Sequence, residues 1–220
     1  MRTDIAATRR APDRAWSGSR SRERVAASYL RRLPAGWYLF HDVPIGSRSA
    51  AIDHVVVGPP GVFNVHRKHE TRDVRVTATA VMVGGRARDY VQVARFEATR
   101  TSALLSAAAG RPAPVRSLLA LTVDELVIDA QPPGVAAVHV GDLAGWLLSQ
   151  AELWAPDDVH AIARAAHRPG TWTAPIRPRA GDPCVCGGEL VPRDHAPDRQ
   201  PVLACSGFPR CRRTRMIESP

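Results

Sequence analysis

The sequence predicts an α/β fold, with one mixed β-sheet flanked by helices and a small cysteine-rich unit at the C-terminus. Short runs rich in β-branched residues alternate with longer stretches of helical periodicity, a pattern typical of α/β layers. Two of the runs, 52–57 and 62–66, flank Gly58-Pro59-Pro60-Gly61, which indicates a β-hairpin. All four cysteines lie beyond residue 183, after a stretch that contains Pro and Gly.

The N-terminal part of the sequence is predicted to form an arm, a helix and a strand. Residues 1–18 are rich in Arg, Pro, Ser and Gly and are expected to form a flexible basic arm. A serine at 19 or 21 can cap a helix to about Arg32, since apolar residues recur there at helical spacing. Pro34 ends this helix, and a strand begins at 37–40.

The middle of the chain is predicted to form the remaining strands and three helices. The longest helix is expected over 90–108, where Gly110 and Pro112 stop it. The other predicted elements are strands at 74–77, 81–83, 118–123 and 135–140 and helices at 141–148 and 156–166. Residues 19–167 are therefore predicted to form one domain, 168–181 a linker, and 182–217 a separate four-cysteine unit.

The net charge of +9 is concentrated at the two ends of the chain. Residues 1–32 hold nine Arg against three acids, and 168–220 hold nine Arg against five acids. The segment between them is close to neutral. Two basic ends favour a polyanion as partner, with nucleic acid preferred over an anionic membrane surface. An arginine-rich composition with solvated tails is the alternative.

The sequence contains no stretch that approaches the length of a membrane span, and its first residues lack the apolar segment of a secretory signal. We therefore expect a soluble, cytoplasmic protein without a membrane partner. In the cytoplasm, four cysteines indicate metal ligands more than disulfides.

The hairpin carries the first candidate site. In a hairpin symmetric about Pro59-Pro60, facing residues have numbers that sum to 119, which places Asp53 opposite His66. Alternation predicts Asp53, Asn64, His66 and Lys68 on one face and Ile52, Val56, Phe63 and Val65 on the other. An acid, an imidazole and an ammonium would then share one patch. The alternative is the solvated face of an ordinary half-buried hairpin.

Lys68 is the only lysine in the chain, and every other basic residue counted with it is an arginine. A lysine is a compact point charge, whereas arginine is a planar fork. A site that needs a point donor beside a phosphate would keep lysine, which makes Lys68 a candidate catalytic residue.

The four cysteines form two clusters, Cys184-Val-Cys186 and Cys205 to Cys211. Two cysteine pairs from tight turns are typical of a zinc ribbon, in which a structural Zn²⁺ stabilises a unit too small for its own core. A two-residue spacer is usual, but the first pair has a single residue between its cysteines. Cys184 could be a strained ligand, or His195 could replace it; four unligated thiols are the remaining alternative.

Arginines surround the last cysteine. On a folded ribbon they would form a compact patch that contacts phosphates, although a basic cluster is often only solvated. The residues concerned are Arg210, Arg212, Arg213 and Arg215.

Two segments resemble known families. Residues 52–59, Ile-Asp-His-Val-Val-Val-Gly-Pro, with Gly61-Val62-Phe63 and a lysine on the next strand, look like the nuclease-related domain (NERD). The resemblance covers about 17–125 and more weakly extends to 167, where it is similar to actinobacterial members. The tail around Cys186-Gly-Gly-Glu-Leu-Val resembles the C-terminal zinc ribbon of bacterial type I topoisomerases.

The first resemblance implies a restriction-endonuclease-like fold, whose signature is an Asp followed by acid-x-Lys on the next strand. Asp53 matches the metal-binding Asp, Lys68 the lysine, and Glu23 the acid of the first helix. Gln92 matches a polar position at the start of the long helix. The acid expected two residues before the lysine is missing, because His66 stands there, and Arg22 replaces the small residue before Glu23.

The implied mechanism is hydrolysis of a phosphodiester assisted by Mg²⁺ or Mn²⁺, in which Lys68 steadies the attacking water and the developing charge. Asp53 and His66 would hold the cation. Because Mg²⁺ prefers oxygen ligands, His66 predicts weak Mg²⁺ binding, a preference for Mn²⁺ or another transition metal, or loss of cleavage. The competing hypotheses are a DNA nuclease, a DNA-binding protein without catalysis, and a protein-interaction module.

Overall fold

The computed structural model describes residues 26–45, 51–174, 178–195 and 200–216. Its main sheet has five strands in the order β1-β2-β3-β7-β9. The first three strands are antiparallel, whereas β7 pairs in parallel with both β3 and β9. The strands are β1 (Tyr38–Pro44), β2 (Ala51–Gly58), β3 (Gly61–His69), β7 (Val115–Thr122) and β9 (Val135–His139). The predicted mixed sheet is therefore confirmed.

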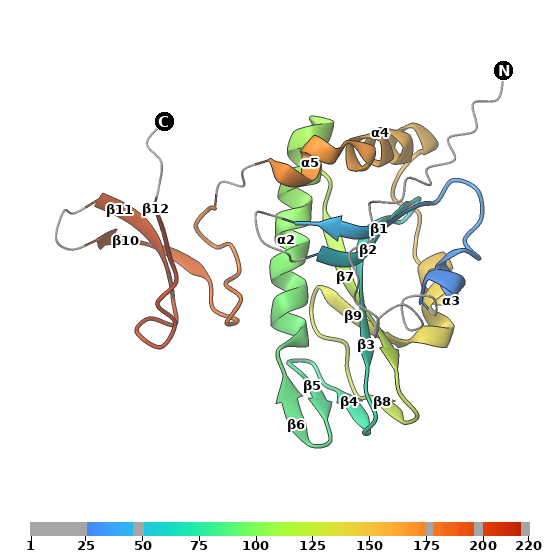
Figure 1. Ribbon diagram of the computed structural model, residues 1–220, viewed down its shortest axis with the longest axis horizontal. Helices are drawn as coiled ribbons and strands as arrows, with labels where there is room; N and C mark the ends of the chain where they lie inside the picture. The colour runs from blue at the N-terminus through green and yellow to red at the C-terminus, as the bar shows by residue number, and fades with distance from the viewer. Residues whose placement is uncertain (1–25, 46–50, 175–177, 196–199, 217–220) are drawn as a thin grey trace, which may run out of the picture.

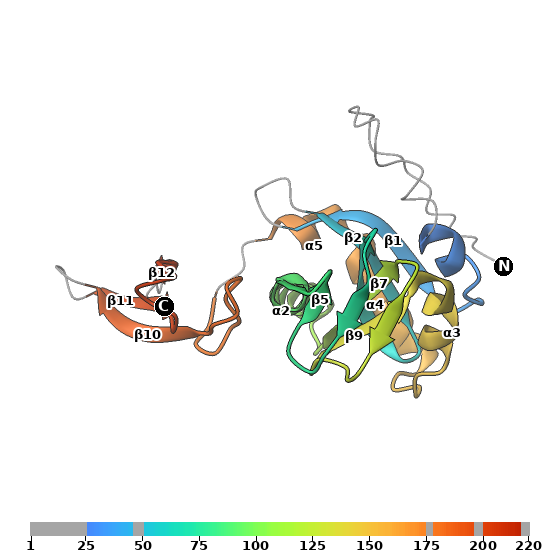
Figure 2. The ribbon, with the colours of Figure 1, turned by 90° about the horizontal axis from the view of Figure 1, so that it is seen from below.

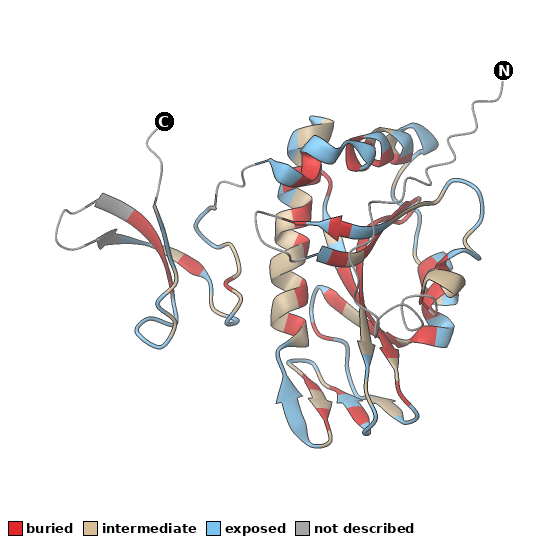
Figure 3. Ribbon diagram, viewed as in Figure 1, coloured by how far each residue is buried: buried red, intermediate tan, exposed pale blue. Residues whose placement is uncertain are grey.

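Helices cover both faces of this sheet (Figures 1 and 2). The helices α2 (Tyr90–Ala109), α4 (Pro156–His167) and α5 (Pro169–Thr173) pack on one face through Leu105, Ile162 and Trp172. Helical residues 26–30, the 3-10 turn η1 (Val140–Asp142) and α3 (Leu143–Leu148) cover the other face, with Leu30 and Leu143 in the core. Buried residues line the inner sides of these layers (Figure 3).

A smaller four-stranded sheet, in the order β6-β5-β4-β8, extends from one end of the domain. Its strands are β4 (Val74–Val76), β5 (Val81–Val83), β6 (Arg86–Arg88) and β8 (Leu126–Ile128). Its valines share a core with Val91 and Ala94 of α2. The start of α2 is thereby fixed between the two sheets.

The β2–β3 hairpin has the predicted register, because Gly58 pairs with Gly61 and His54 pairs with Val65. Gly58 lies so close to the Trp37 ring that a Cβ at this position would be 2.3 Å from a ring carbon. A larger residue there would have to displace the indole. The packing of Trp37 therefore favours glycine at position 58.

The prediction that Ile52 shares a face with Val56 and Phe63 is wrong. Ile52 instead packs in the core that contains Val55 and Leu105, on the α2 side of the sheet. Asp42 of β1, near Asp53, has a left-handed φ of 49°, and the regular pairing of β1 with β2 is interrupted at this point. At this interruption the side chains of β2 change the face of the sheet toward which they point, so Ile52 lies on the same face as Val55.

The segment predicted as a linker over 168–181 begins with the packed helix α5. Trp172 of this helix is buried and donates a hydrogen bond from Nε1 to the carbonyl of Ala166, 2.8 Å away. The chain therefore remains in the core of the domain as far as α5. The tail then forms a three-stranded antiparallel sheet of β10 (Leu190–His195), β11 (Gln200–Cys205) and β12 (Thr214–Met216).

None of the helices in the described ranges combines the length and the apolar character that a bilayer crossing requires.

Candidate functional site

The candidate site lies between strand β3 and helix α2. This strand pairs with β2 on one side and β7 on the other, so its side chains are held in fixed positions. Asn64 donates a buried hydrogen bond of 2.9 Å to Thr101 Oγ1, which ties the strand directly to the helix. Two residues further along, His66 faces the same helix. Lys68 follows near its N-terminal end.

His66 is bound between a carboxylate and a hydroxyl. Its Nδ1 lies 3.2 Å from Glu97 Oε2 of α2, and its Nε2 lies 3.5 Å from Ser117 Oγ of β7. Ser117 donates its own proton to the carbonyl of Ala94, 2.7 Å away. The Ser117 oxygen can therefore accept a proton from Nε2, and in that tautomer Nδ1 carries no proton. In the other tautomer Nδ1 carries the proton and faces the Glu97 carboxylate as a donor.

Burial, assisted by the charge of Lys68, lowers the pKa of His66 to about 4. The imidazole is therefore neutral at pH 7, and its contact with Glu97 is not an ion pair. With the proton on Nε2, the Nδ1 lone pair faces a carboxylate oxygen. Two such lone pairs repel each other unless a proton or a cation lies between them. Burial raises the pKa of Glu97, which favours a shared proton in the absence of a cation.

Lys68 points its ammonium at the ring of Tyr90, 4.9 Å from the centroid. Tyr90 is held in turn by a hydrogen bond from its hydroxyl to Glu70, and burial raises its pKa to about 12. Within the described part of the chain, no carboxylate oxygen lies within 4.0 Å of the Lys68 amine. Its charge nevertheless lowers the pKa of both His66 and Glu97, which shows that the three groups share one environment.

Asp53 is held by Arg67. One carboxylate oxygen accepts from the Arg67 backbone N–H and the other from its Nη2, both at 2.8 Å. Its charge still acts on His66 and Glu97, raising the pKa of each. Asp53 therefore borders the site, but both of its oxygens are engaged by a guanidinium and an amide.

Two further predicted residues lie elsewhere. Glu23 falls outside the residues that the structure describes. Gln92 lies in the first turns of α2, where it contacts the cysteine-rich tail: a Cβ on Gly187 would be 3.0 Å from Gln92 Cγ. Its Oε1 is buried and has no hydrogen-bond partner among the described residues.

Sequence reasoning missed Glu97. It is the only acid in the twenty residues of α2, and it lies between Ala94 and Ala98, which are both buried. A single acid on the buried side of a long helix was the signal that could have identified it. The structure thus brings a carboxylate next to the position from which the expected acid of β3 is missing.

The four cysteines come together in the tail. Cys184 Sγ lies 3.7 Å from Cys211 Sγ, Cys186 Sγ lies 3.3 Å from Cys205 Sγ, and all four sulfurs are within 4.8 Å of one another. Thiolates at tetrahedral Zn²⁺ lie roughly 3.8 Å apart, as Zn–S bonds of about 2.3 Å require. The donor set and its spacing therefore fit a tetrahedral zinc ion.

The one-residue spacer does not exclude Cys184 from this cluster. Gly187 adopts a φ of +92° and donates its N–H to the Cys184 carbonyl at 2.9 Å, which closes a tight turn. Cys184 is buried beside Cys205, and burial raises the pKa of both thiols. The backbone N–H of Gly188 lowers the pKa of Cys186 to about 7. The side chain of His195, the alternative ligand, is outside the described part of the structure.

The four predicted arginines do not form one uniform patch. Arg210, Arg212 and Arg215 are exposed, whereas Arg213 is half-buried and its guanidinium lies 5.9 Å from the ring of Phe96 on α2. Arg213 therefore joins the tail to the same helix that carries Glu97.

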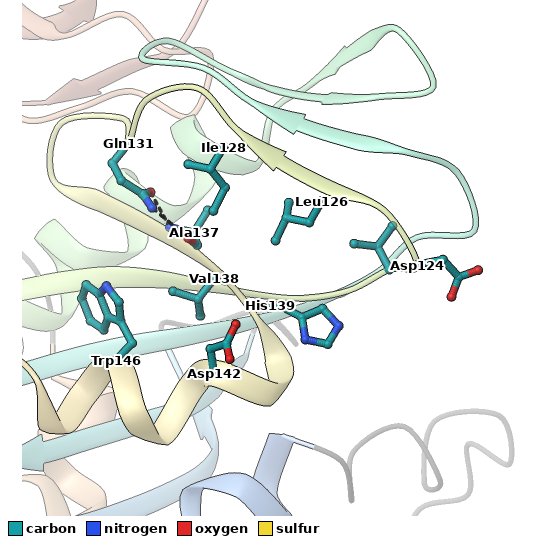
Figure 4. A pocket seen from close by; sticks show the side chains of 10 residues that line it. Asp124, Leu126, Ile128, Gln131, Ala137, Val138, His139, Asp142 and Trp146 are labelled. Carbon is teal, nitrogen blue, oxygen red and sulfur yellow. Dashed lines mark hydrogen bonds between the residues drawn. The ribbon is translucent and has the colours of Figure 1, made fainter.

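A cavity of about 610 Å³ opens beside the edge strand β9, between β8 and α3 (Figure 4). Asp124, His139, Asp142 and Trp146 line it, and the Gln131 amide makes two hydrogen bonds with the Ala137 backbone at its rim. None of the residues predicted for catalysis or metal binding contributes to its lining. The chemistry-bearing residues are concentrated at β3 and α2 instead.

Comparison with known proteins gives one match. Residues 17–122 match the family model described as nuclease-related domain. The matched segment is slightly less than half of the chain; it contains Asp53, His66, Lys68 and Glu97 and excludes the four cysteines. No curated protein matches the chain, and no solved structure matches it. The match supports a function related to nucleases in general.

Proposed function

Starting from the match of residues 17–122, we propose that the chain is a nucleic-acid-binding protein that hydrolyses phosphodiester bonds of DNA with the help of a divalent cation. The observation that carries this proposal is the contact of 3.2 Å between His66 Nδ1 and Glu97 Oε2. Glu97 supplies the carboxylate that β3 lacks, and Lys68 lies in the same environment.

The donor pair suits a transition-metal ion. Cis ligands with bonds of about 2.1 Å lie roughly 3.0–3.4 Å apart, and the two facing lone pairs meet this spacing. One imidazole and one carboxylate favour Mn²⁺ over Mg²⁺. Glu97 and His66 would hold the ion, and Asp53 is a further carboxylate in electrostatic range. A bound ion would polarise the phosphate and lower the pKa of a coordinated water.

The remaining side chains have positioning and electrostatic roles. Lys68, placed against Tyr90, would donate to a phosphate oxygen and stabilise the charge that develops on the phosphoryl group. Ser117, by accepting a proton from Nε2, would fix the tautomer of His66 that leaves Nδ1 free as an acceptor. Burial keeps the imidazole neutral, which is the form that binds a metal.

The tail completes the proposal as a structural zinc ribbon over 182–217, with the four cysteines as ligands. Residues 19–167 would be the nuclease-related domain and 1–18 a basic arm. DNA is the proposed partner and the cytoplasm the proposed location. The actinobacterial likeness belongs to the same proposal.

The test is nicking of supercoiled and single-stranded DNA by the purified full chain with Mg²⁺ or Mn²⁺. We expect cleavage with Mn²⁺ that exceeds cleavage with Mg²⁺ and is lost in Lys68→Ala. Cleavage by the Asp53→Ala variant shows whether the carboxylate held by Arg67 contributes to hydrolysis. Absence of cleavage with either metal, together with intact DNA binding, would refute the hydrolytic proposal.

A second candidate function is DNA binding without catalysis. The observation that favours it is the engagement of both Asp53 oxygens by Arg67, which leaves the matching metal-binding Asp with a protein cation as partner. In that case Asp53→Ala would destabilise the fold but leave DNA affinity and its salt dependence unchanged.

A further inference from the structure

One flank of α2 faces the cysteine-rich tail. Gln92, Phe96 and Arg100 recur every four residues and therefore lie in one row along the helix. At the start of this row Gln92 contacts Gly187, and one turn later the Phe96 ring receives the guanidinium of Arg213. The tail therefore approaches the helix at two points one turn apart.

The row ends where positive charges converge. The guanidinium carbons of Arg100 and Arg213 lie 5.5 Å and 5.9 Å from the centroid of the same Phe96 ring. Arg100 comes from the domain and Arg213 from the tail, and Arg215 of β12 is close enough to act on Arg100 electrostatically. Two guanidinium groups, one from the domain and one from the tail, therefore meet at Phe96, and a third, that of Arg215, follows two residues after Arg213.

These charges lack a matching acid. Over the described ranges, no carboxylate oxygen lies within 4.0 Å of any of the three guanidinium groups. The pKa of Arg100 is lowered, first by burial and then by Arg215 and Arg213, while Glu97 counteracts this. Like charges held together at a packed junction are unfavourable unless an anion binds among them.

We propose that Arg100, Arg213 and Arg215 form a phosphate-binding site, shared between the domain and the tail, for the backbone of a nucleic-acid strand. This inference rests on the proposed function and specifies where the strand crosses the molecule. Guanidinium groups bind phosphate through paired hydrogen bonds, and Phe96 holds two of them in place. Arg210 and Arg212, the exposed neighbours, are not part of this site.

The position of the site links it to the candidate active site. Phe96 and Glu97 are consecutive residues of α2, so the junction lies on one side of the helix and the His66 contact on the adjacent side. Arg100 also acts electrostatically on Glu97, lowering its pKa. A strand held at the junction would therefore pass one helical turn or less from Glu97, and the tail would help to position the phosphodiester.

The experiment measures the binding of a labelled oligonucleotide, single-stranded and duplex, to the full zinc-loaded chain as a function of salt. We expect Arg100→Ala and Arg213→Ala each to weaken binding and to reduce the salt slope by roughly 1. Their combination should cost less than the sum, because both side chains bind one phosphate. Arg164→Ala, an exposed arginine on α4, is the matched control and should have no such effect.

Thermal melting without nucleic acid tests whether the arginine charges destabilise the folded protein when no phosphate is bound. Removing one of three repelling charges should leave the melting temperature of Arg100→Ala equal to or above that of the wild type, although the variant binds phosphate less well. A variant that loses stability and affinity together would overturn the inference. So would losses that match those of Arg164→Ala or that add fully in the double variant.

The results of these experiments also distinguish failure of the phosphate-binding site from failure of the proposed function. Unchanged binding in the arginine variants, with cleavage still lost in Lys68→Ala, would refute the shared site alone. If the wild type binds neither oligonucleotide, the proposed function fails. Inorganic pyrophosphate then becomes the probe: a rise in melting temperature that Arg100→Ala abolishes would retain the anion site, and no rise would refute it.

Discussion

At the scale of single residues, the candidate site depends on the proton of His66. In the tautomer proposed for cation binding, Ser117 accepts this proton from Nε2, and Nδ1 faces the Glu97 carboxylate as a second acceptor. An acid at position 66 would have completed the acid-x-Lys pattern, but it would have placed two carboxylates together in a buried space. A neutral imidazole avoids that repulsion and still offers one ligand atom.

Buried histidines should make the stability of the domain depend on pH. Burial lowers the pKa of His54 to about 3 and of His66 to about 4, below the ordinary value of 6.5. The unfolded chain therefore binds protons below pH 6.5 that the folded chain does not, and stability falls as the pH falls from 6.5 toward 4. Between pH 6.5 and 5 the loss is at most about 2 kcal/mol for each residue.

Urea unfolding of the wild type and of His54→Leu at pH 7 and pH 5 measures this contribution. His54 stands 2.7 Å from His41, Nδ1 to Nδ1, and its Nε2 has no hydrogen-bond partner among the described residues. We expect the stability of His54→Leu to fall less between pH 7 and pH 5 than that of the wild type. An equal fall in both proteins would show that His54 does not contribute.

At the scale of elements, the hairpin was predictable and the partner of its polar face was not. The symmetric GPPG turn and the β-branched runs predicted the register, which the structure confirms from Gly58 to His54. They could not predict that the strand would be irregular near Asp42, because a local break in pairing depends on β1. Asp53 was expected to lie opposite His66. In the structure the Asp53 carboxylate instead accepts hydrogen bonds from Arg67.

The length of α2 was also predictable, because its helical pattern ends at Gly110, which adopts a left-handed φ of 66°. Its functional residue was not, because the hydrophobic pattern of a helix predicts which side is buried but not which strand it meets. Glu97 could be placed beside His66 only once β3, β7 and α2 were assembled.

The close packing of the hairpin turn predicts a contrast between two glycines. Gly58→Ala would place a Cβ within 2.3 Å of the Trp37 ring, so we expect a loss of about 1–3 kcal/mol from the free energy of unfolding. Gly145→Ala in α3 meets nothing within 4 Å and should stabilise the protein by roughly 0.5–1 kcal/mol. Denaturant unfolding of both variants measures the difference; equal effects would contradict the packing described for Trp37.

At the scale of the whole molecule, the tail has too little core to fold by itself. Apart from its cysteines, its buried apolar residues in the described part of the chain are Leu190, Val202, Leu203 and Ala204. The domain, by contrast, has three buried clusters. The cysteine spacing predicted a zinc ribbon, but the packing of its arginines against α2 could not be read from the sequence, because it requires both units to be folded.

Removal of the metal should therefore affect the two parts unequally. We expect one equivalent of zinc in the purified chain, released on chelation, with loss of structure in the tail while the domain stays folded. Cys205→Ser should have the same effect, since Cys205 is fully buried in the cluster. Metal analysis and amide spectra before and after chelation measure this. Cooperative unfolding of the domain on chelation, or a tail that stays folded without metal, would contradict the prediction.

We propose that Glu97 replaces the missing acid of β3, and the rate of DNA nicking with Mn²⁺ by Glu97→Gln tests this directly. The variant keeps the shape of the side chain and removes its charge, and Glu152→Gln, an exposed acid far along the chain, is the control. We expect the rate to fall roughly 100-fold or more in Glu97→Gln and to stay at the wild-type value in the control. A Glu97→Gln variant that cleaves DNA at the wild-type rate would contradict it.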